Sequence, residues 1–270
     1  MEDELRTLPS AVGIDADDEV IVGTPARNQA MLGPDRTLLS VKRLMGSDES
    51  LTLGQQQLKP QEVSAILLRT LKQRAEAHLG HEVSKAVITV PAFFTDNQRQ
   101  ATRQAGELAG LEVVRIINEP TAAALTYETG SDCNKRLLIY DLGGGTFDVS
   151  IVQIEQGVVE VLSSHGDTRL GGDDFDQLLL DHVCDSFANE HQIDLRTIPA
   201  ARSRLRQAVE EAKMRLSTEA YTTIEEPFLA EHKRKPLNLE VTIDRSEYEE
   251  LIGPLVKKTI ESVGRCQTLC

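Results

Sequence analysis

The sequence has 270 residues, 40% of them hydrophobic, which suits about two domains with a buried core. Its 29 Lys and Arg face 43 Asp and Glu, and the net charge of −14 disfavours non-specific binding to nucleic acids or anionic membranes. No apolar run approaches the length of a membrane span, and the acidic start Met1–Leu5 is unlike a signal peptide, so we expect a cytoplasmic protein.

Strand and helix signals alternate over the first half of the chain. Gly80 ends the first helical pattern, Pro91 stops the first apolar run, and Thr95 is a helix cap. We expect helices over 60–79 and 95–110, a short helix over 120–125, and strands over 86–90 and 113–117. This order predicts crossover connections and a buried sheet core.

A polar break at 130–135 indicates a boundary between two lobes. Gly157 then predicts a hairpin turn, Asp244 is the cap of a last helix, and Gly253 with Pro254 should interrupt that helix. Before Asp244 we expect three strands over 137–141, 147–154 and 158–162. Two long helices should follow over 173–190 and 199–217, and then a strand pair over 221–229 and 237–243.

The four cysteines Cys133, Cys184, Cys266 and Cys270 are too sparse for a disulfide scaffold. Cys266 and Cys270 are four residues apart, but no second pair or nearby His completes a zinc set. We expect free thiols.

The sharpest motif is Asp-Leu-Gly-Gly-Gly-Thr-Phe-Asp at 141–148, between two predicted strands. Three consecutive glycines allow positive φ and close backbone approach, so their N–H groups can converge on phosphate oxygens. The carboxylates of Asp141 and Asp148 would repel a polyphosphate unless Mg²⁺, keeping several of its waters, lies between them. A plain glycine-rich β-hairpin is the alternative for the glycines alone, whereas the whole octet favours a phosphate site.

Six segments, in order across nearly the whole chain, carry a family resemblance. They are 41–46, 87–94 with 98–102, 117–124, 141–148, 166–167 with 170–176, and 210–217. The chain resembles the nucleotide-binding domain of the DnaK-type seventy-kilodalton heat-shock chaperones. The resemblance implies an α/β, actin-like ATPase (ribonuclease H-like) fold with two lobes, each a central sheet flanked by helices plus a peripheral subdomain.

The resemblance also implies a division of the chain. In lobe I, the peripheral subdomain with an incomplete N-terminus covers 1–62, and the core covers 63–136. In lobe II, the first part of the core covers 137–170, the peripheral subdomain covers 171–252, and the start of the remaining core covers 253–270.

Catalytic roles follow by motif match. Lys42 would orient the water that attacks the γ-phosphate, and Thr146 would contact the phosphates. Glu119, Asp141 and Asp148 would be catalytic and would hold Mg²⁺, largely through water. Read alone, Lys42 is a surface lysine and Glu119 a carboxylate favoured at a helix start.

Further nucleotide contacts implied by the resemblance are Gly143, Gly144, Gly145, Thr146, Gly171, Gly172, Glu210, Lys213, Met214 and Ser217. Glu210, Lys213 and Ser217 share one helix face, which read alone is an ordinary charged surface. Met214 stands where other members have an arginine over the base. Pro91 and Arg99 match the switch and relay positions of the family.

The function implied is ATP binding and hydrolysis in a stress-response chaperone that couples nucleotide state to binding and folding of unfolded polypeptides. ATP or ADP and Mg²⁺ are the implied ligands, with K⁺ as a further candidate. Clients would bind through a peptide-binding domain that this sequence lacks. A J-domain cochaperone and a nucleotide-exchange factor are the implied partners, and nucleic acid and membrane are not.

The chain departs from the family at both ends. The opening G-I-D-L-G-T-T-N-S loop has only the echo Gly13–Asp15, and a later glycine pair that clasps adenosine is absent. We therefore expect a truncated domain, with Met1 as an internal start or fragment boundary and with unpaired apolar sheet edges. The alternative is a non-hydrolysing binding or regulatory fragment that retains cochaperone surfaces. A sugar-kinase-like phosphotransferase is disfavoured because the motifs are of the chaperone type.

Overall fold

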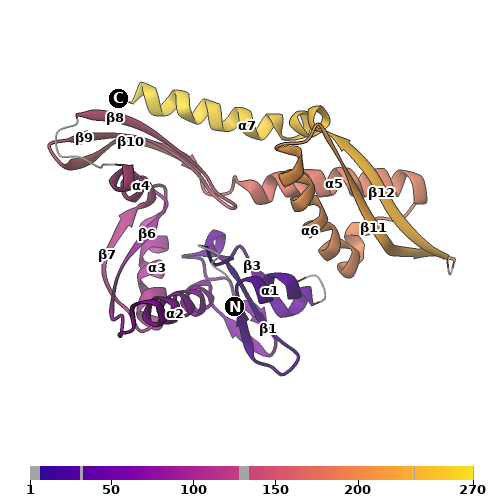
Figure 1. Ribbon diagram of the computed structural model, residues 1–270, viewed down its shortest axis with the longest axis horizontal. Coiled ribbons are helices and arrows are strands. Elements are labelled where there is room, and N and C mark those ends of the chain that lie inside the picture. Colours follow the sequence, from indigo (N-terminus) through magenta and orange to yellow (C-terminus); the bar gives the residue numbers. More distant parts are fainter. Residues whose placement is uncertain (1–6, 31–32, 128–133, 234, 270) are drawn as a thin grey trace.

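A computed structural model describes residues 7–30, 33–127, 134–233 and 235–269. Cys133, Cys270 and most of the expected break at 130–135 lie outside these residues. The ribbon shows two groups of elements, one from the first half of the chain and one from the second (Figure 1). The fold is mixed α/β, as expected.

The chain begins with a small antiparallel sheet in which β1 lies between β2 and β3. A hairpin of β4 and β5 follows, and Val12, Leu53 and Val63 form the buried cluster beneath both. The elements are β1 (Ala11–Ile14), β2 (Val20–Val22), α1 (Thr24–Gln29), the 3₁₀ helix η1 (Pro34–Arg36), β3 (Thr37–Leu39), the 3₁₀ helix η2 (Val41–Leu44), β4 (Leu51–Leu53) and β5 (Gln56–Leu58).

The next part of the chain is the predicted crossover unit. It consists of α2 (Pro60–Leu79), β6 (Lys85–Val90), α3 (Asp96–Leu108), β7 (Glu112–Asn118) and α4 (Glu119–Tyr127). β6 and β7 pair in parallel through α3. Gly80 ends α2 in the left-handed conformation, φ 73°, and Thr95 caps α3 by accepting a hydrogen bond from the Gln98 N–H. These local predictions are confirmed.

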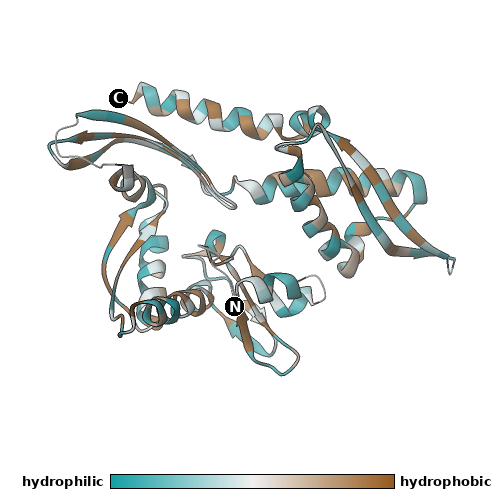
Figure 2. Cartoon of the chain, viewed as in Figure 1, coloured by the Kyte–Doolittle hydropathy of each residue, from teal (hydrophilic) through white to brown (hydrophobic). Residues whose placement is uncertain are grey.

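The expected buried sheet core is wrong for β6 and β7. Val113 and Ile88 face α3, where a Cβ on Gly106 would come within 2.4 and 2.9 Å of them. Val87 and Val114 point to the other face and are each 56% exposed. Within the described residues the two strands pair only with each other, so their apolar edges are unpaired, as expected. Both strands are largely hydrophobic (Figure 2).

The second half begins with a three-stranded antiparallel meander in the order β10-β9-β8. Its strands are β8 (Lys135–Leu142), β9 (Phe147–Glu155) and β10 (Val158–Asp167). On one face Ala124 of α4 packs against Val152 and Ile154. On the other face Cys266 of α7 packs against Phe147 and Val149. The sheet is therefore covered by helices from both halves of the chain.

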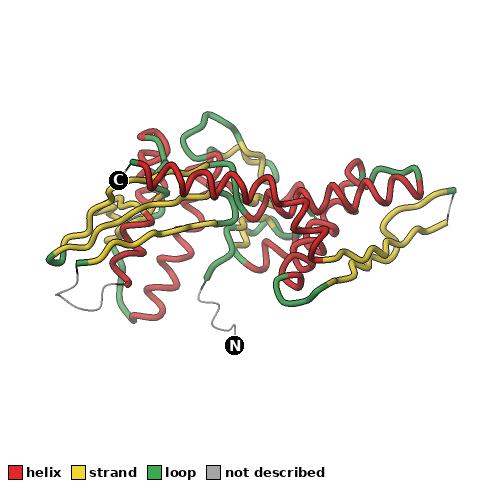
Figure 3. Tube along the Cα trace, turned by 90° about the horizontal axis from the view of Figure 1, so that it is seen from above, coloured by secondary structure: helices red, strands yellow, loops and turns green. Residues whose placement is uncertain are grey.

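The largest core cluster lies beyond this sheet. Leu180 and Phe187 of α5, Leu205 of α6 and Ile243 of β12 belong to it. The elements are α5 (Gly172–His191), the 3₁₀ helix η3 (Leu195–Thr197), α6 (Pro199–Leu216), β11 (Tyr221–His232), β12 (Lys235–Asp244) and α7 (Arg245–Thr268). The tube shows α7 running along the molecule, with the β11–β12 hairpin at one end (Figure 3).

Helix α7 begins after the Asp244 cap, as expected, although the Asp244 side chain makes no capping hydrogen bond. The expected interruption at Gly253 and Pro254 is wrong, because the helix is continuous through both residues. Pro254 and Glu250 are both exposed, so the Glu250 carbonyl that loses its helical partner can bond to water. Cys184 and Cys266 are free, as expected, and the structure buries both of them.

Candidate functional site

The octet 141–148 forms the end of the β8–β9 hairpin. The Gly143 N–H donates to the Thr146 carbonyl oxygen at 2.9 Å and closes the turn. Asp141 and Asp148 are directly opposite each other in the antiparallel register. Opposite residues project on the same face, so both carboxylates belong to one site. The glycine-rich hairpin and the two-carboxylate site are therefore present together.

Space, and not positive φ, restricts Gly145 and Gly171, which corrects the expectation from sequence. None of Gly143, Gly144 and Gly145 has a positive φ. A Cβ on Gly145 would lie 2.9 Å from Arg43 Nε, and one on Gly171 would lie 2.4 Å from the Gly144 carbonyl oxygen. The Gly172 N–H donates to the Gly143 carbonyl oxygen at 2.9 Å. The two glycine segments thus pack backbone to backbone.

Lys42 lies on η2 in the first half of the chain. Its Nζ is 3.0 Å from Glu119 Oε1. Glu119 is the first residue of α4, where the helix dipole favours a carboxylate. The ion pair holds the ammonium group beside the acidic end of the β8–β9 hairpin.

Asp148 is almost fully buried, at 3% exposure, and its Oδ1 has no hydrogen-bond partner. Burial raises the pKa of its carboxyl to about 7, and the charges of Glu119 and Asp141 act in the same direction. The Phe93 N–H and Lys42 partly oppose this rise in pKa. An acid in this position is suited to a bound cation, because a cation would compensate both the burial and the repulsion.

The carboxylates of Glu119, Asp141 and Asp148 supply hard oxygen donors, which are the ligands that Mg²⁺ prefers. Among the residues that the structure describes, no three His, Cys, Asp or Glu side chains lie close enough to ligate an ion directly. Any Mg²⁺ held by these three acids would therefore keep most of its waters.

A cleft of about 440 Å³ opens in front of this cluster. It is lined from the first half of the chain by Lys42 and Glu119 and from the second half by Asp141 and Glu210. The predicted site residues among its lining are Lys42, Glu119, Asp141, Gly143, Gly144, Gly145, Thr146 and Glu210.

The remaining predicted contacts lie behind or beside the cleft. Gly171 and Gly172 pack beneath the glycine turn. Lys213 is tied to Asp176 at 2.7 Å. Met214 is 64% exposed, and the exposed Ser217 Oγ donates to the Lys213 carbonyl oxygen at 3.4 Å. The structure therefore places Glu210 at the cleft but leaves Lys213, Met214 and Ser217 out of its lining.

Pro91 and Arg99 are brought together. Arg99 donates to the carbonyl oxygens of Ala92 and Phe94, both at 3.0 Å, and to Asn118 Oδ1 at 2.8 Å. A longer contact of 3.5 Å reaches the Pro91 carbonyl oxygen. Since Asn118 directly precedes Glu119, Arg99 connects the Pro91 loop to the acidic cluster.

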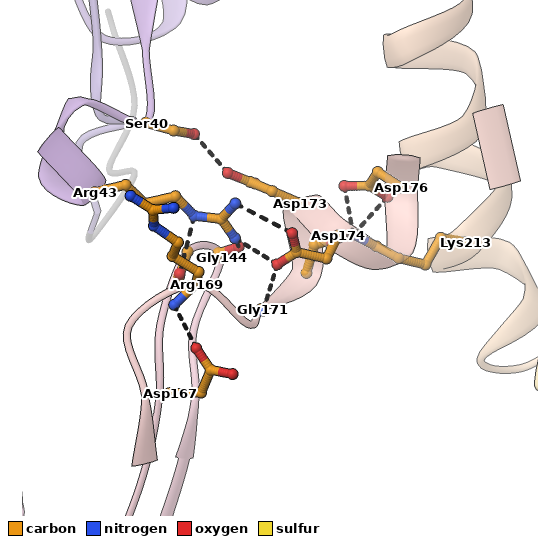
Figure 4. A network of polar contacts seen from close by, with 12 residues as sticks. Ser40, Arg43, Gly144, Asp167, Arg169, Gly171, Asp173, Asp174, Asp176 and Lys213 are labelled. Atoms are coloured by element: carbon orange, nitrogen blue, oxygen red, sulfur yellow. Dashed lines mark hydrogen bonds and ion pairs between the residues drawn. The ribbon is translucent and has the colours of Figure 1, made fainter. Parts of the chain in front are cut away.

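Contacts between the two halves were not predicted from the sequence. Arg27 Nη2 is 2.5 Å from Glu210 Oε2, and Ser40 Oγ donates to Asp173 Oδ2 at 2.6 Å. Arg43 reaches both Asp174 and the glycine turn (Figure 4). The available signal was the position of Arg43 next to Lys42 and of Asp174 in the first turn of a helix after two glycines.

Comparison with known families gives one result. A family model described as Hsp70 protein matches residues 2–52 and 49–268. The match includes every site residue described above. In the described part of the chain no helix is long and apolar enough to cross a bilayer.

Proposed function

The chain belongs to the Hsp70 family of chaperone ATPases, and we propose that it binds and hydrolyses ATP in the cleft between Lys42 and the 141–148 octet. Its mixed α/β structure is the actin-like ATPase fold of that family. Family membership also implies nucleotide binding with a divalent metal in general.

One observation carries the proposal. Lys42 from one half of the chain and Asp141, Asp148 and Thr146 from the other meet at a single glycine turn, and Glu119 is ion-paired with Lys42 there. A lysine and three acids around a backbone loop are suited to a polyphosphate and its cation.

In this proposal the backbone of Gly143, Gly144 and Gly145 and the hydroxyl of Thr146 contact the phosphates. The turn is closed by its own hydrogen bond and is supported by Gly171 and Gly172 beneath it. A site that is formed before the ligand arrives loses little ordering free energy on binding.

Glu119, Asp141 and Asp148 would hold Mg²⁺ through its water shell. When bound, Mg²⁺ neutralises phosphate charge. Asp148 supports this assignment because its carboxylate is buried and its Oδ1 has no hydrogen-bond partner. K⁺ stays a further candidate ligand.

Lys42 would orient the attacking water and stabilise the negative charge that develops during phosphoryl transfer. Glu119 limits the freedom of the Lys42 ammonium group through the 3.0 Å ion pair. Positioning and electrostatics are the main catalytic devices in reactions of this type.

We further propose that nucleotide state is coupled to the binding and folding of unfolded polypeptides by a domain outside this sequence. The Arg99 contacts between the Pro91 loop and Asn118 support a relay starting at Glu119. The same proposal includes two partners, a J-domain cochaperone and a nucleotide-exchange factor. It also includes a stress-response role, a cytoplasmic location and the division of the chain into subdomains after residues 62, 136, 170 and 252. Glu210, Lys213, Met214 and Ser217 would face the adenosine after some rearrangement of α6. No described contact favours the non-hydrolysing alternative.

Calorimetry with ATP tests nucleotide binding. The proposal predicts micromolar binding in the presence of Mg²⁺ and much weaker binding with EDTA. Asp141→Asn should weaken the Mg²⁺ dependence, whereas Glu160→Gln, an exposed acid on β10, serves as the matched control. The absence of binding under both conditions would refute the proposal.

A further inference from the structure

Arg43 forms the densest set of contacts between the two halves of the chain. Its Nε donates to the Gly145 carbonyl oxygen at 2.9 Å. Its Nη1 and Nη2 donate to Asp174 Oδ1 and Oδ2 at 3.2 and 2.5 Å. One guanidinium therefore binds the glycine turn and the first turn of α5 at once (Figure 4).

Asp174 extends this contact to the second glycine segment. Its Oδ2 also accepts the Gly171 N–H at 2.8 Å, in the manner of a capping box. The carboxylate is thus fixed by α5 before Arg43 binds it. A bidentate pair with a fixed carboxylate defines the orientation of the guanidinium as well as its distance.

Arg43 is next to Lys42 on the single turn of η2. Because the two residues share this turn, a displacement of η2 away from Gly145 would move Lys42 relative to Thr146. We propose that Arg43 is a positioning residue, which holds Lys42 of the first half at a fixed place over the phosphate turn of the second half. This inference rests on the proposed ATPase function, but the contact itself can be tested without nucleotide.

Gly145 provides an independent probe of the same contact. An added Cβ would lie 2.9 Å from Arg43 Nε and 3.2 Å from Arg43 Cγ, with no other heavy atom among its three nearest neighbours. Since φ at Gly145 is not positive, alanine suits the backbone there and its methyl group displaces only the arginine. Gly144 is the matched control, because its nearest neighbour, Asp173 Oδ1, is at an ordinary 3.5 Å.

The test is a double-mutant cycle of Arg43→Ala, Gly145→Ala and their combination, with Gly144→Ala as control. Hydrogen exchange of the nucleotide-free chain is followed over 141–148, and kcat and KM for ATP are followed in parallel. We expect either single substitution to increase exchange of the turn severalfold and to lower kcat by up to about a hundredfold, with a smaller change in KM. The double variant should match Arg43→Ala, and Gly144→Ala should match the wild type in exchange.

The inference would be overturned by unchanged exchange in Arg43→Ala, or by a Gly145→Ala effect that is fully retained in the Arg43→Ala background. A loss that falls on KM alone also contradicts a positioning role. Gly145→Ala retains the arginine, so if Arg43→Ala folds poorly the exchange of Gly145→Ala alone tests the contact, and unchanged exchange in that variant would overturn the inference. If the wild type binds no ATP, the proposed function fails, while the exchange data still decide whether Arg43 holds the turn.

Discussion

Asp141 of β8 and Asp148 of β9 are register partners across the hairpin, so two like charges face each other at its end. Directly opposed carboxylates destabilise a strand pair. Asp148 is in addition buried, which raises its pKa to about 7. The hairpin therefore retains an unfavourable arrangement that a bound cation would relieve, as expected where stability is given up for binding.

Asp148→Asn should stabilise the chain when no ligand is present. The substitution removes a buried charge beside Glu119 and Asp141, and its amide oxygen can still accept the Phe93 N–H. We expect the Tm at pH 8 in EDTA to rise by about 2–4 °C. The same variant should lose the extra Tm increase that Mg²⁺ and ATP give the wild type. A lower Tm in EDTA would contradict the repulsion argument, and Glu160→Gln is the control.

Arg99→Ala should destabilise the loop that begins at Pro91. The carbonyl oxygens of Ala92 and Phe94 and the Asn118 side chain would lose their donor. The expected loss is about 1–3 kcal/mol in the free energy of unfolding, measured with urea. Arg69→Ala, which removes a single exposed bond to the Leu108 carbonyl oxygen, should cost less. Equal losses for the two variants would show that the Arg99 contacts are not special.

Cys184 should react slowly with iodoacetamide in the folded chain. Burial raises the pKa of its thiol to about 11. At pH 8 its alkylation should be at least about a hundredfold slower than in urea, measured by mass spectrometry of the Cys184 peptide. Rapid modification under native conditions would contradict its burial.

The same thiol should make the chain less stable in alkali. The unfolded thiol loses its proton near pH 8.5, before the folded one does. Above that pH the unfolded state binds fewer protons than the folded state, so the free energy of unfolding decreases as the pH rises. The contribution of the protonated thiol to stability is therefore complete below about pH 8.5 and is lost as the pH rises toward 11. Cys184→Ala should show a smaller decrease in urea midpoint between pH 8 and pH 10 than the wild type. An identical decrease would exclude Cys184 as its source.

The outer face of β6 and β7 should promote association. Val87 and Val114 are both exposed on strands that, within the described residues, pair only with each other. Val87→Thr with Val114→Thr should reduce light scattering at high concentration and leave the Tm within about 1 °C, because neither side chain is in the core. Unchanged scattering would show that this face does not drive association.

Local signals predicted most elements correctly. Gly80 and Thr95 act within one helical turn, and the β9–β10 turn at Gly157 likewise depends on neighbouring residues. The prediction at Pro254 was wrong because the free-energy cost of a proline inside a helix depends on its surroundings. Here the exposed Glu250 carbonyl can bond to water, and the helix continues. The prediction of a buried sheet core was wrong at Val87, because the burial of a strand depends on what covers it and not on its composition.

The sequence named candidate site residues but not the contacts between them. The octet places Asp141 and Asp148 opposite each other through a short turn, which local sequence can specify. The Arg43–Asp174 pair joins residues 131 positions apart, and Ser40 pairs with Asp173 over 133 positions. No periodicity or spacing reports such contacts, because they depend on how the two halves of the chain meet.

Single-turnover hydrolysis of ATP tests whether the cleft between Lys42 and the 141–148 octet is a hydrolytic site. The chain is mixed in excess with γ-labelled ATP and Mg²⁺, and phosphate release is compared for the wild type, Lys42→Ala and Thr146→Ala, with binding measured separately. We expect hydrolysis by the wild type, and in both variants a loss of turnover that exceeds the loss of affinity. ATP bound by the wild type without phosphate release, or turnover that falls only as far as affinity does, would contradict this expectation.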